Sequence, residues 1–93
     1  MHIISRPVLR TFWQRWPDAE APLVRWHTLL THTTAQDFAA LKAVFGAADW
    51  VKGYVVFDIG GNKYRIVCDV VFRSQTAYIK HVFTHKEYDQ WQP

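Results

Sequence analysis

The stretch YVVFDIGGNKYRIVCDVVFRSQTAYIKHVFT, residues 54–84, decides the fold of this 93-residue chain. Val, Ile, Phe and Tyr gather in three runs, which span Tyr54–Ile59, Lys63–Phe72 and Thr76–Thr84. Gly60-Gly61-Asn62 separates the first two runs, and Arg73-Ser74-Gln75 separates the last two. Segments of this composition are typical of turns. We therefore expect three antiparallel strands that follow one another as a meander.

The residues before this stretch predict one short strand and two helices. His2–Ser5 reads as an edge strand, and Ser5 is expected to cap a first helix that tolerates Pro7 in its first turn. Pro17-Asp18 would end that helix, and a second would begin near Pro22. Apolar residues at helical spacing define the expected buried faces: Val8, Leu9, Phe12, Trp13 and Trp16, then Leu23, Trp26, His27 and Leu30.

A third, short helix is predicted before the strands. Thr34-Ala-Gln-Asp37 resembles a capping box, and Phe38, Leu41, Val44 and Phe45 would form the apolar side of the helix that it opens. Gly46–Gly53 would be a connection without regular structure. The expected fold is a single α+β domain over residues 1–93, with an N-terminal strand and helices packed on a small antiparallel sheet.

Three tryptophans in these helices allow two interpretations. Trp13, Trp16 and Trp26 could form a platform on which nucleic acid bases stack. Their helical register favours a place in the core instead.

Composition limits the class of protein. Hydrophobic residues make up 49% and aromatic residues 16% of the chain, which argues for a packed interior rather than disorder. The net charge of +3 suits a polyanionic partner, although many globular proteins carry as much. Cys68 is the single cysteine, so we expect no internal disulfide, a buried inert thiol and a reducing cytoplasm. No apolar run approaches the length of a membrane span, and no signal peptide is recognisable.

Alternation along the second run predicts which side chains face the helices. One face would carry Tyr64, Ile66, Cys68, Val70 and Phe72, and we expect the helices to cover it. The other face would carry Lys63, Arg65, Val67, Asp69 and Val71, and we expect it to stay open. A merely solvated polar face would have the same pattern.

The end of the third run adds titratable groups to that open face. His85, Lys86 and Tyr88 follow Thr84, and the meander would bring them beside Arg65. Cations together with an imidazole and a phenol suit a surface that holds a phosphodiester and moves a proton near it. His81 and His85 would lie about 13 Å apart on a strand, so we expect neither a metal site nor another cofactor.

Three blocks of this sequence resemble one family. They are Leu41-Lys-Ala-Val-Phe45, Phe57-Asp-Ile-Gly-Gly-Asn-Lys-Tyr-Arg65 and Thr84-His-Lys-Glu-Tyr88. In this order and at these spacings they are similar to the HigB family of bacterial toxins, which belongs to the RelE-like messenger-RNA endoribonucleases. The resemblance implies a RelE-like fold of order β-α-α-β-β-β, with extra helical turns allowed. It also implies metal-independent cleavage of messenger RNA, commonly on the ribosome.

The resemblance further implies partners and residue roles. A HigA-like helix-turn-helix antitoxin would neutralise the toxin and would supply any binding to operator DNA. Arg65 matches the arginine that RelE-like toxins place on this strand, where a guanidinium suits phosphate oxygens. His85 is the candidate general acid or base, and which of the two remains open. Further candidates are Lys86 and Tyr88 for catalysis and Lys52, Asn62 and Lys63 for RNA binding, although Asn62 could instead be a turn residue.

A second interpretation belongs to another class. The chain could be a RelE-fold module that binds antitoxin or RNA and has little or no nuclease activity, since the same basic face would serve both functions.

Overall fold

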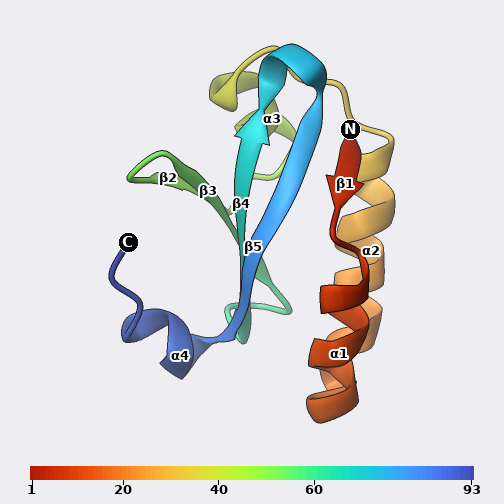
Figure 1. The fold of residues 1–93 in the computed structure, drawn as a ribbon, viewed down its shortest axis with the longest axis vertical. Helices are drawn as coiled ribbons and strands as arrows, with labels where there is room; N and C mark the ends of the chain where they lie inside the picture. Colours follow the sequence, from red (N-terminus) through yellow and green to blue (C-terminus); the bar gives the residue numbers. More distant parts are fainter.

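Two helices cover one face of a five-stranded sheet in the computed structural model, which describes residues 1–93 (Figure 1). The helices are α1 (Pro7–Arg15) and α2 (Glu20–Thr31). The strands are β1 (His2–Ile4), β2 (Ala48–Val51), β3 (Tyr54–Ile59), β4 (Tyr64–Val71) and β5 (Thr76–Thr84). The sheet order is β1-β5-β4-β3-β2, with β1 parallel to β5 and every other pair antiparallel. The α+β fold and the three-stranded meander are confirmed.

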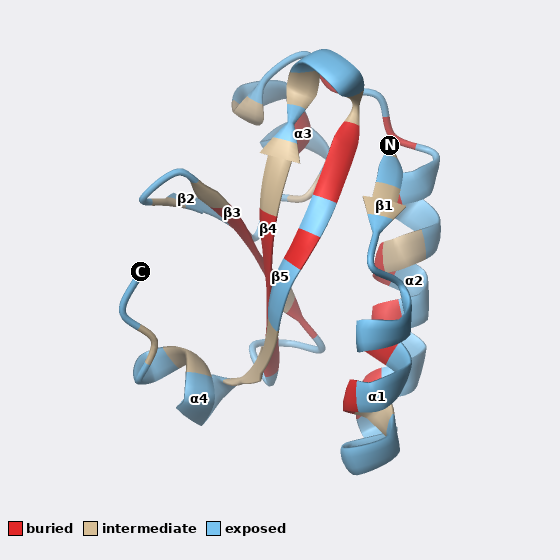
Figure 2. Ribbon diagram, viewed as in Figure 1, coloured by how far each residue is buried: buried red, intermediate tan, exposed pale blue.

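The core forms where the inner sides of these helices meet the sheet. Figure 2 shows the buried segments along the central strands and on the helix sides that face them. The helical contribution is Leu9, Phe12, Leu23, Trp26 and Leu30, and the sheet contributes Val55, Phe57, Ile66, Cys68, Ala77 and Ile79. Cys68 is buried as expected, and burial raises the pKa of its thiol. Val8 and Trp16 were expected in the core, but both are exposed.

The structure corrects two predicted helix caps. Ser5 does not cap α1, because Arg6 occupies the N-cap position and no side chain bonds to the start of the helix. Pro7 follows at the first helical position, where it has no backbone N–H that would require an acceptor. Thr34 does not cap the third helix, α3 (Phe38–Val44). Asp37 does so, by accepting a hydrogen bond from the Ala40 N–H at 2.9 Å. A side chain caps only when its residue sits at the junction itself.

The predicted connection over Gly46–Gly53 is wrong, because it contains the edge strand β2. This strand pairs with β3 through a two-residue turn, Lys52-Gly53, with Val51 opposite Tyr54. Both turn residues have positive φ, 50° at Lys52 and 89° at Gly53, as a type I′ hairpin turn requires. Asparagine or aspartate usually marks the first of these positions, and a lysine there hides the hairpin from a reading of the sequence.

A bulge in β5 decides which of its side chains share a face with Arg65. Val67 pairs with His81 and Cys68 pairs with Ile79, so Lys80 is an extra residue between them. A bulge of this kind shifts the alternation of every residue beyond it. Phe83 consequently lies opposite Arg65, and His81 lies opposite Val67.

The chain leaves β5 as a fourth helix, α4 (His85–Asp89), which lies on the side of the sheet away from α1 and α2 (Figure 1). Helix α4 begins with a capping box: the Thr84 hydroxyl accepts from the Glu87 N–H, and the Glu87 carboxylate accepts from the Thr84 N–H. The order β-α-α-β-β-β therefore gains a strand, β2, and two short helices, α3 and α4. None of the helices combines the length and hydrophobicity that a membrane-spanning segment requires.

Candidate active site

Arg65 is buried, with 7% of its surface exposed, whereas the sequence predicted an open face around it. Its Nε forms an ion pair with Asp58 Oδ1 at 2.7 Å, across the β3–β4 ladder. Its Nη1 donates to the backbone carbonyls of Asn62 at 2.9 Å and Tyr64 at 3.2 Å, and its Nη2 lies 3.0 Å from His85 Nδ1. Every nitrogen of the guanidinium thus has a protein partner.

The contact with Arg65 selects one tautomer of the neutral His85 ring. A guanidinium can only donate, so His85 Nδ1 must be the acceptor, and the neutral ring then carries its hydrogen on Nε2. Nε2 lies 3.4 Å from Asp89 Oδ2, one helical turn further along α4. The backbone N–H of His85 donates to the Lys63 carbonyl at 2.9 Å, which ties the start of α4 to the start of β4.

Tyr88 covers the other side of Arg65. The guanidinium carbon lies 5.4 Å from the centre of the Tyr88 ring, a cation–π arrangement. Burial raises the pKa of Tyr88, and the carboxylates of Asp49, Asp58 and Asp89 act in the same direction while Arg65 opposes them. The phenol therefore remains protonated at neutral pH and can donate a hydrogen bond.

We call Asp58, Arg65, His85 and Tyr88 the Arg65 cluster. The helix α4 closes this cluster because its capping box turns the chain back across β4 immediately after β5. The predicted proximity of Arg65, His85 and Tyr88 is confirmed. The predicted openness is wrong, since α4 supplies the cover and Asp58 neutralises the charge.

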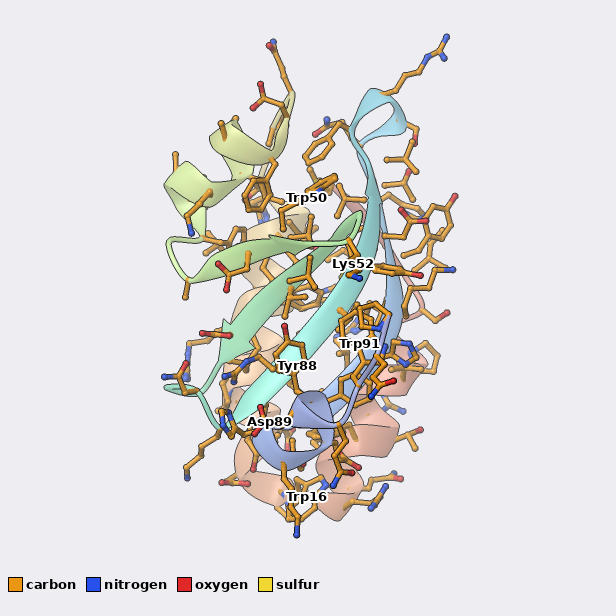
Figure 3. All side chains as sticks on the ribbon, turned by 90° about the vertical axis from the view of Figure 1, so that its left-hand side faces the viewer. Trp16, Trp50, Lys52, Tyr88, Asp89 and Trp91 are labelled. Atoms are coloured by element: carbon orange, nitrogen blue, oxygen red, sulfur yellow. The ribbon has the colours of Figure 1, made fainter.

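Aromatic side chains extend from Tyr88 over the same face of the sheet. Figure 3 views this face and labels Trp91 above Tyr88, with Lys52 higher still and Trp16 below α4. The Trp91 ring lies within about 6 Å of the rings of Tyr54, His81, Phe83 and Tyr88. The C-terminal residues thus cover the sheet beside the Arg65 cluster.

A groove opens next to the Arg65 cluster and has His85 as a shared wall. It encloses about 630 Å³. We call it the Trp16 groove, and its lining is Trp16, Asp18, Gly61, Asn62, Lys63, Tyr64, Thr84, His85 and Lys86. Two lysines and one carboxylate leave a net positive charge on its walls.

One carboxylate organises the Trp16 groove. Asp18 accepts a hydrogen bond from the Tyr64 hydroxyl and forms an ion pair with Lys63 at 3.2 Å. These two contacts lower the pKa of Asp18, the bond from Tyr64 having the larger effect. Burial and the Asp18 contact raise the pKa of Tyr64 to about 12. Tyr64 in turn packs edge-on against Phe12, with ring centres 5.4 Å apart, so the groove wall is tied to the core.

The structure gathers most of the predicted site residues. Lys63, Lys86 and Asn62 line the Trp16 groove beside His85, while Lys52 lies in the β2–β3 turn and does not line the groove. Asn62 has a φ of 75° and offers its carbonyl to Arg65, which agrees with a turn role. Asp18, Asp58 and Asp89 were missed, and Trp16 was assigned to the core in preference to a base-stacking surface. The contact of Asp58 with Arg65 could have been predicted from the hairpin register alone, because a four-residue turn between Ile59 and Tyr64 places Asp58 opposite Arg65.

Comparisons with known proteins find relatives over nearly the whole chain. Residues 19–91 match the model of the HigB_toxin family, described as the RelE-like toxic component of a toxin–antitoxin system. The mRNA interferase toxin HigB of Escherichia coli K12 is 36% identical over 92 residues, which cover 96% of this chain and 88% of that protein. The mRNA interferase HigB of Shigella flexneri has the same identity and coverage. The mRNA interferase HigB of Escherichia coli O6:H1 is 26% identical over 93 residues, or 97% of this chain and 90% of its own length.

Proposed function

This chain belongs to the HigB family of RelE-like toxins, and on that premise we propose that it is the toxin of a toxin–antitoxin pair and cleaves messenger RNA. The single observation that carries the proposal is the junction at His85. There the imidazole of His85 is hydrogen-bonded to Arg65 and also lines a groove that contains two lysines. A phosphodiester in the groove would lie against the same imidazole.

The reaction requires three things of the protein when no metal takes part. The RNA 2′-hydroxyl must lose its proton as its oxygen attacks the adjacent phosphorus, the phosphorane must be stabilised, and the departing 5′-oxygen must gain a proton. The bond to the 5′-oxygen breaks as the bond to the 2′-oxygen forms. The products are a 2′,3′-cyclic phosphate and a 5′-hydroxyl end.

We assign the proton transfer to His85 and the charge stabilisation to Arg65, Lys86 and Tyr88. His85 Nδ1 carries the lone pair that can accept a proton, and this lone pair accepts a hydrogen bond from Arg65 Nη2 at 3.0 Å. A bound phosphate competes for Arg65 and so frees Nδ1, which would couple RNA binding to the activation of His85. Tyr88 stays protonated and is able to donate to a phosphate oxygen.

One observation favours a second function. Arg65 is buried and paired with Asp58. In this arrangement it stabilises the fold as well as belonging to the candidate active site. A module that only binds antitoxin or RNA, with weak or no cleavage, would tolerate such a neutralised arginine. The two functions differ in one respect, because only the nuclease requires Arg65 to exchange partners.

The test is to induce the protein in bacterial cells and map the 5′ ends of messenger RNA. New ends in cells that express the wild-type protein, and none with Arg65→Ala produced at the same level, are expected. Growth arrest without new ends would reject the nuclease and favour the binding module. Repeating the mapping with purified ribosomes present and absent decides whether cleavage needs the ribosome, as we propose.

The family implies an antitoxin partner. We propose that this partner is a small HigA-like helix-turn-helix protein, that any contact with operator DNA runs through it, and that the pair acts in the cytoplasm. The net charge of +3 is compatible with direct contact between the toxin and RNA. Co-expression with the neighbouring gene and purification of a stable complex is the expected result, and recovery of free toxin alone would contradict it.

A further inference from the structure

Trp16 is a large aromatic residue that the fold leaves outside the core. It ends the first helix at the point where the chain turns through Pro17–Ala19, a short 3-10 turn, and 38% of it is exposed. It lines the Trp16 groove together with His85 and Lys86, and Figure 3 shows it below α4. Its position in a groove, rather than its exposure alone, places a large apolar ring where a ligand can contact it.

The backbone around Trp16 is held firmly. Its N–H donates to the Phe12 carbonyl at 3.0 Å, and its carbonyl accepts from the Ala19 N–H at 2.9 Å. Two residues further on, Asp18 is anchored to Tyr64 and Lys63. The backbone that carries the indole is therefore fixed, which lowers the ordering entropy that a ligand must overcome to use the ring.

The groove combines the two features that single-stranded nucleic acid requires. A base stacks on an aromatic face whatever its identity, and cations follow the backbone phosphates. Asp18 already occupies Lys63, with 3.2 Å between Lys63 Nζ and Asp18 Oδ2, whereas Lys86 forms no ion pair. Lys86 is thus the free cation on the wall that also holds His85.

We propose that the Trp16 groove is a subsite for single-stranded RNA in which the base of the nucleotide next to the scissile phosphate stacks on Trp16. In this subsite Lys86 contacts the scissile phosphate, and Lys63 contacts the neighbouring phosphate. The inference rests on the proposed function, since His85 defines where the scissile phosphate lies. It predicts a requirement for an unpaired base and little preference for its identity.

The experiment measures binding, apart from cleavage. The probe is an unstructured RNA of roughly ten nucleotides, 2′-O-methylated throughout so that it resists attack, and its affinity is read by fluorescence anisotropy. Trp16→Ala should bind about tenfold more weakly than wild type, and Trp16→Phe should recover most of that loss because a ring remains. The matched control is Trp50→Ala: Trp50 is 53% exposed on β2 and does not line the groove, so its loss should change affinity by less than about twofold.

A second arm uses RNAs that lack one base at successive positions. One such abasic position should weaken binding to wild type as much as Trp16→Ala does and should cause no further loss in Trp16→Ala. Wild-type affinity in a folded Trp16→Ala, or the same loss at every abasic position in both proteins, would overturn the proposal. Thermal melting confirms folding, and the position-specific loss with abasic RNA in the wild-type protein keeps the test decisive if Trp16→Ala unfolds.

The two proposals fail separately. A wild-type protein that cleaves no RNA but shows the Trp16-dependent abasic effect would reject the nuclease and keep the subsite. A wild-type protein that cleaves RNA, with affinity indifferent to Trp16, would reject only the subsite.

Discussion

The Arg65 cluster and the Trp16 groove share His85 but treat their charges in opposite ways. Within the cluster, Arg65 is 7% exposed and has a partner on each nitrogen. Within the groove, the Lys63 side chain is 65% exposed and Lys86 forms no ion pair. A buried charge is stable only when its partners are fixed, whereas an exposed charge is free to meet a ligand. The partners of Arg65 therefore hold it in one position, whereas the lysines of the groove remain available to a ligand.

This difference indicates how the proposed nuclease site would separate the positioning of its residues from the binding of RNA. The residues that must be oriented are locked by strand pairing and by the capping box of α4. Lys63 and Lys86, the residues proposed to contact RNA, have exposed side chains. Substitutions in the two regions should accordingly affect different steps, and the following measurements test that separation.

The largest effect is expected at Arg65. Arg65→Ala should lower cleavage by about two orders of magnitude or more, as the loss of a cation at the transition state does. Because it also leaves Asp58 without its partner, it should lower the free energy of unfolding by on the order of 3 kcal/mol. Single-turnover cleavage and urea unfolding measure the two effects.

The control separates stability from chemistry. Arg65→Ala combined with Asp58→Asn removes the unpaired carboxylate, so stability should recover while cleavage stays low. Arg65→Lys should recover cleavage only in part, because the planar fork that meets Asp58, Asn62 and His85 is lost. Full cleavage by a folded Arg65→Ala would remove Arg65 from the site.

The next effect concerns His85 and marks the boundary between the two regions. His85→Gln should lower single-turnover cleavage roughly 100-fold and leave RNA affinity within a few-fold. The Gln carbonyl can still accept from Arg65, but an amide does not titrate near neutrality. A variant that keeps the wild-type rate would end the proton-transfer role, and one that loses stability instead would make His85 a brace for α4.

A smaller effect is expected from the lysines of the groove. Lys63→Ala and Lys86→Ala should each weaken RNA binding by several-fold and reduce the slope of log affinity against log salt by about 0.7. The cleavage rate at saturating RNA should stay within about twofold in Lys63→Ala and should fall in Lys86→Ala, because only Lys86 is assigned to charge stabilisation at the scissile phosphate. Lys80→Ala is the matched control, since Lys80 is exposed on β5 away from the groove. Equal losses with all three lysines would erase the distinction.

The smallest effect tests the link between groove and core, and it appears only at high pH. The pKa of Tyr64 is raised from 10.0 to about 12, so the folded state keeps a proton that the unfolded state loses. Stability from this group is fully present below pH 10 and declines as the pH rises toward 12. Tyrosinate absorbance of native protein should show a late phase, and Tyr64→Phe should remove the contribution of Tyr64 and leave that of Tyr88. A native protein whose tyrosines all ionise near pH 10 would contradict the Asp18–Tyr64 anchor.

Much of the fold was predictable because its signals are local. The runs at Tyr54–Ile59 and Thr76–Thr84 match β3 and β5 at both ends, since alternation and adjacent turn residues act within a few positions. The missed strand β2 has four residues and a lysine in its turn, too short and too unusual for the same signals. The caps predicted at Ser5 and Thr34 were wrong because several residues near a helix start could serve, and packing selects one.

The site was predictable only in part, for a related reason. The meander indicated that His85 and Tyr88 would meet Arg65, and they do. The burial of Arg65 was not predicted, because it depends on α4 folding back, although Thr84-x-x-Glu87 is a recognisable capping signal. Trp16 was assigned to the core from helical spacing. That spacing no longer applies to Trp16, because α1 ends one residue earlier, at Arg15.

By itself the sequence determined the alternation of helices and strands, the turn at Gly60-Gly61-Asn62 and the residues that carry the family resemblance, because each of these depends on neighbours along the chain. Only the tertiary structure decided that Arg65 pairs with Asp58 and His85 and that Trp16 stands in the groove. It also decided, through the bulge at Lys80, which side chains of β5 face Arg65. Those outcomes depend on strand register and on the way α4 packs, and the energies that select them come from contacts between residues far apart in the chain.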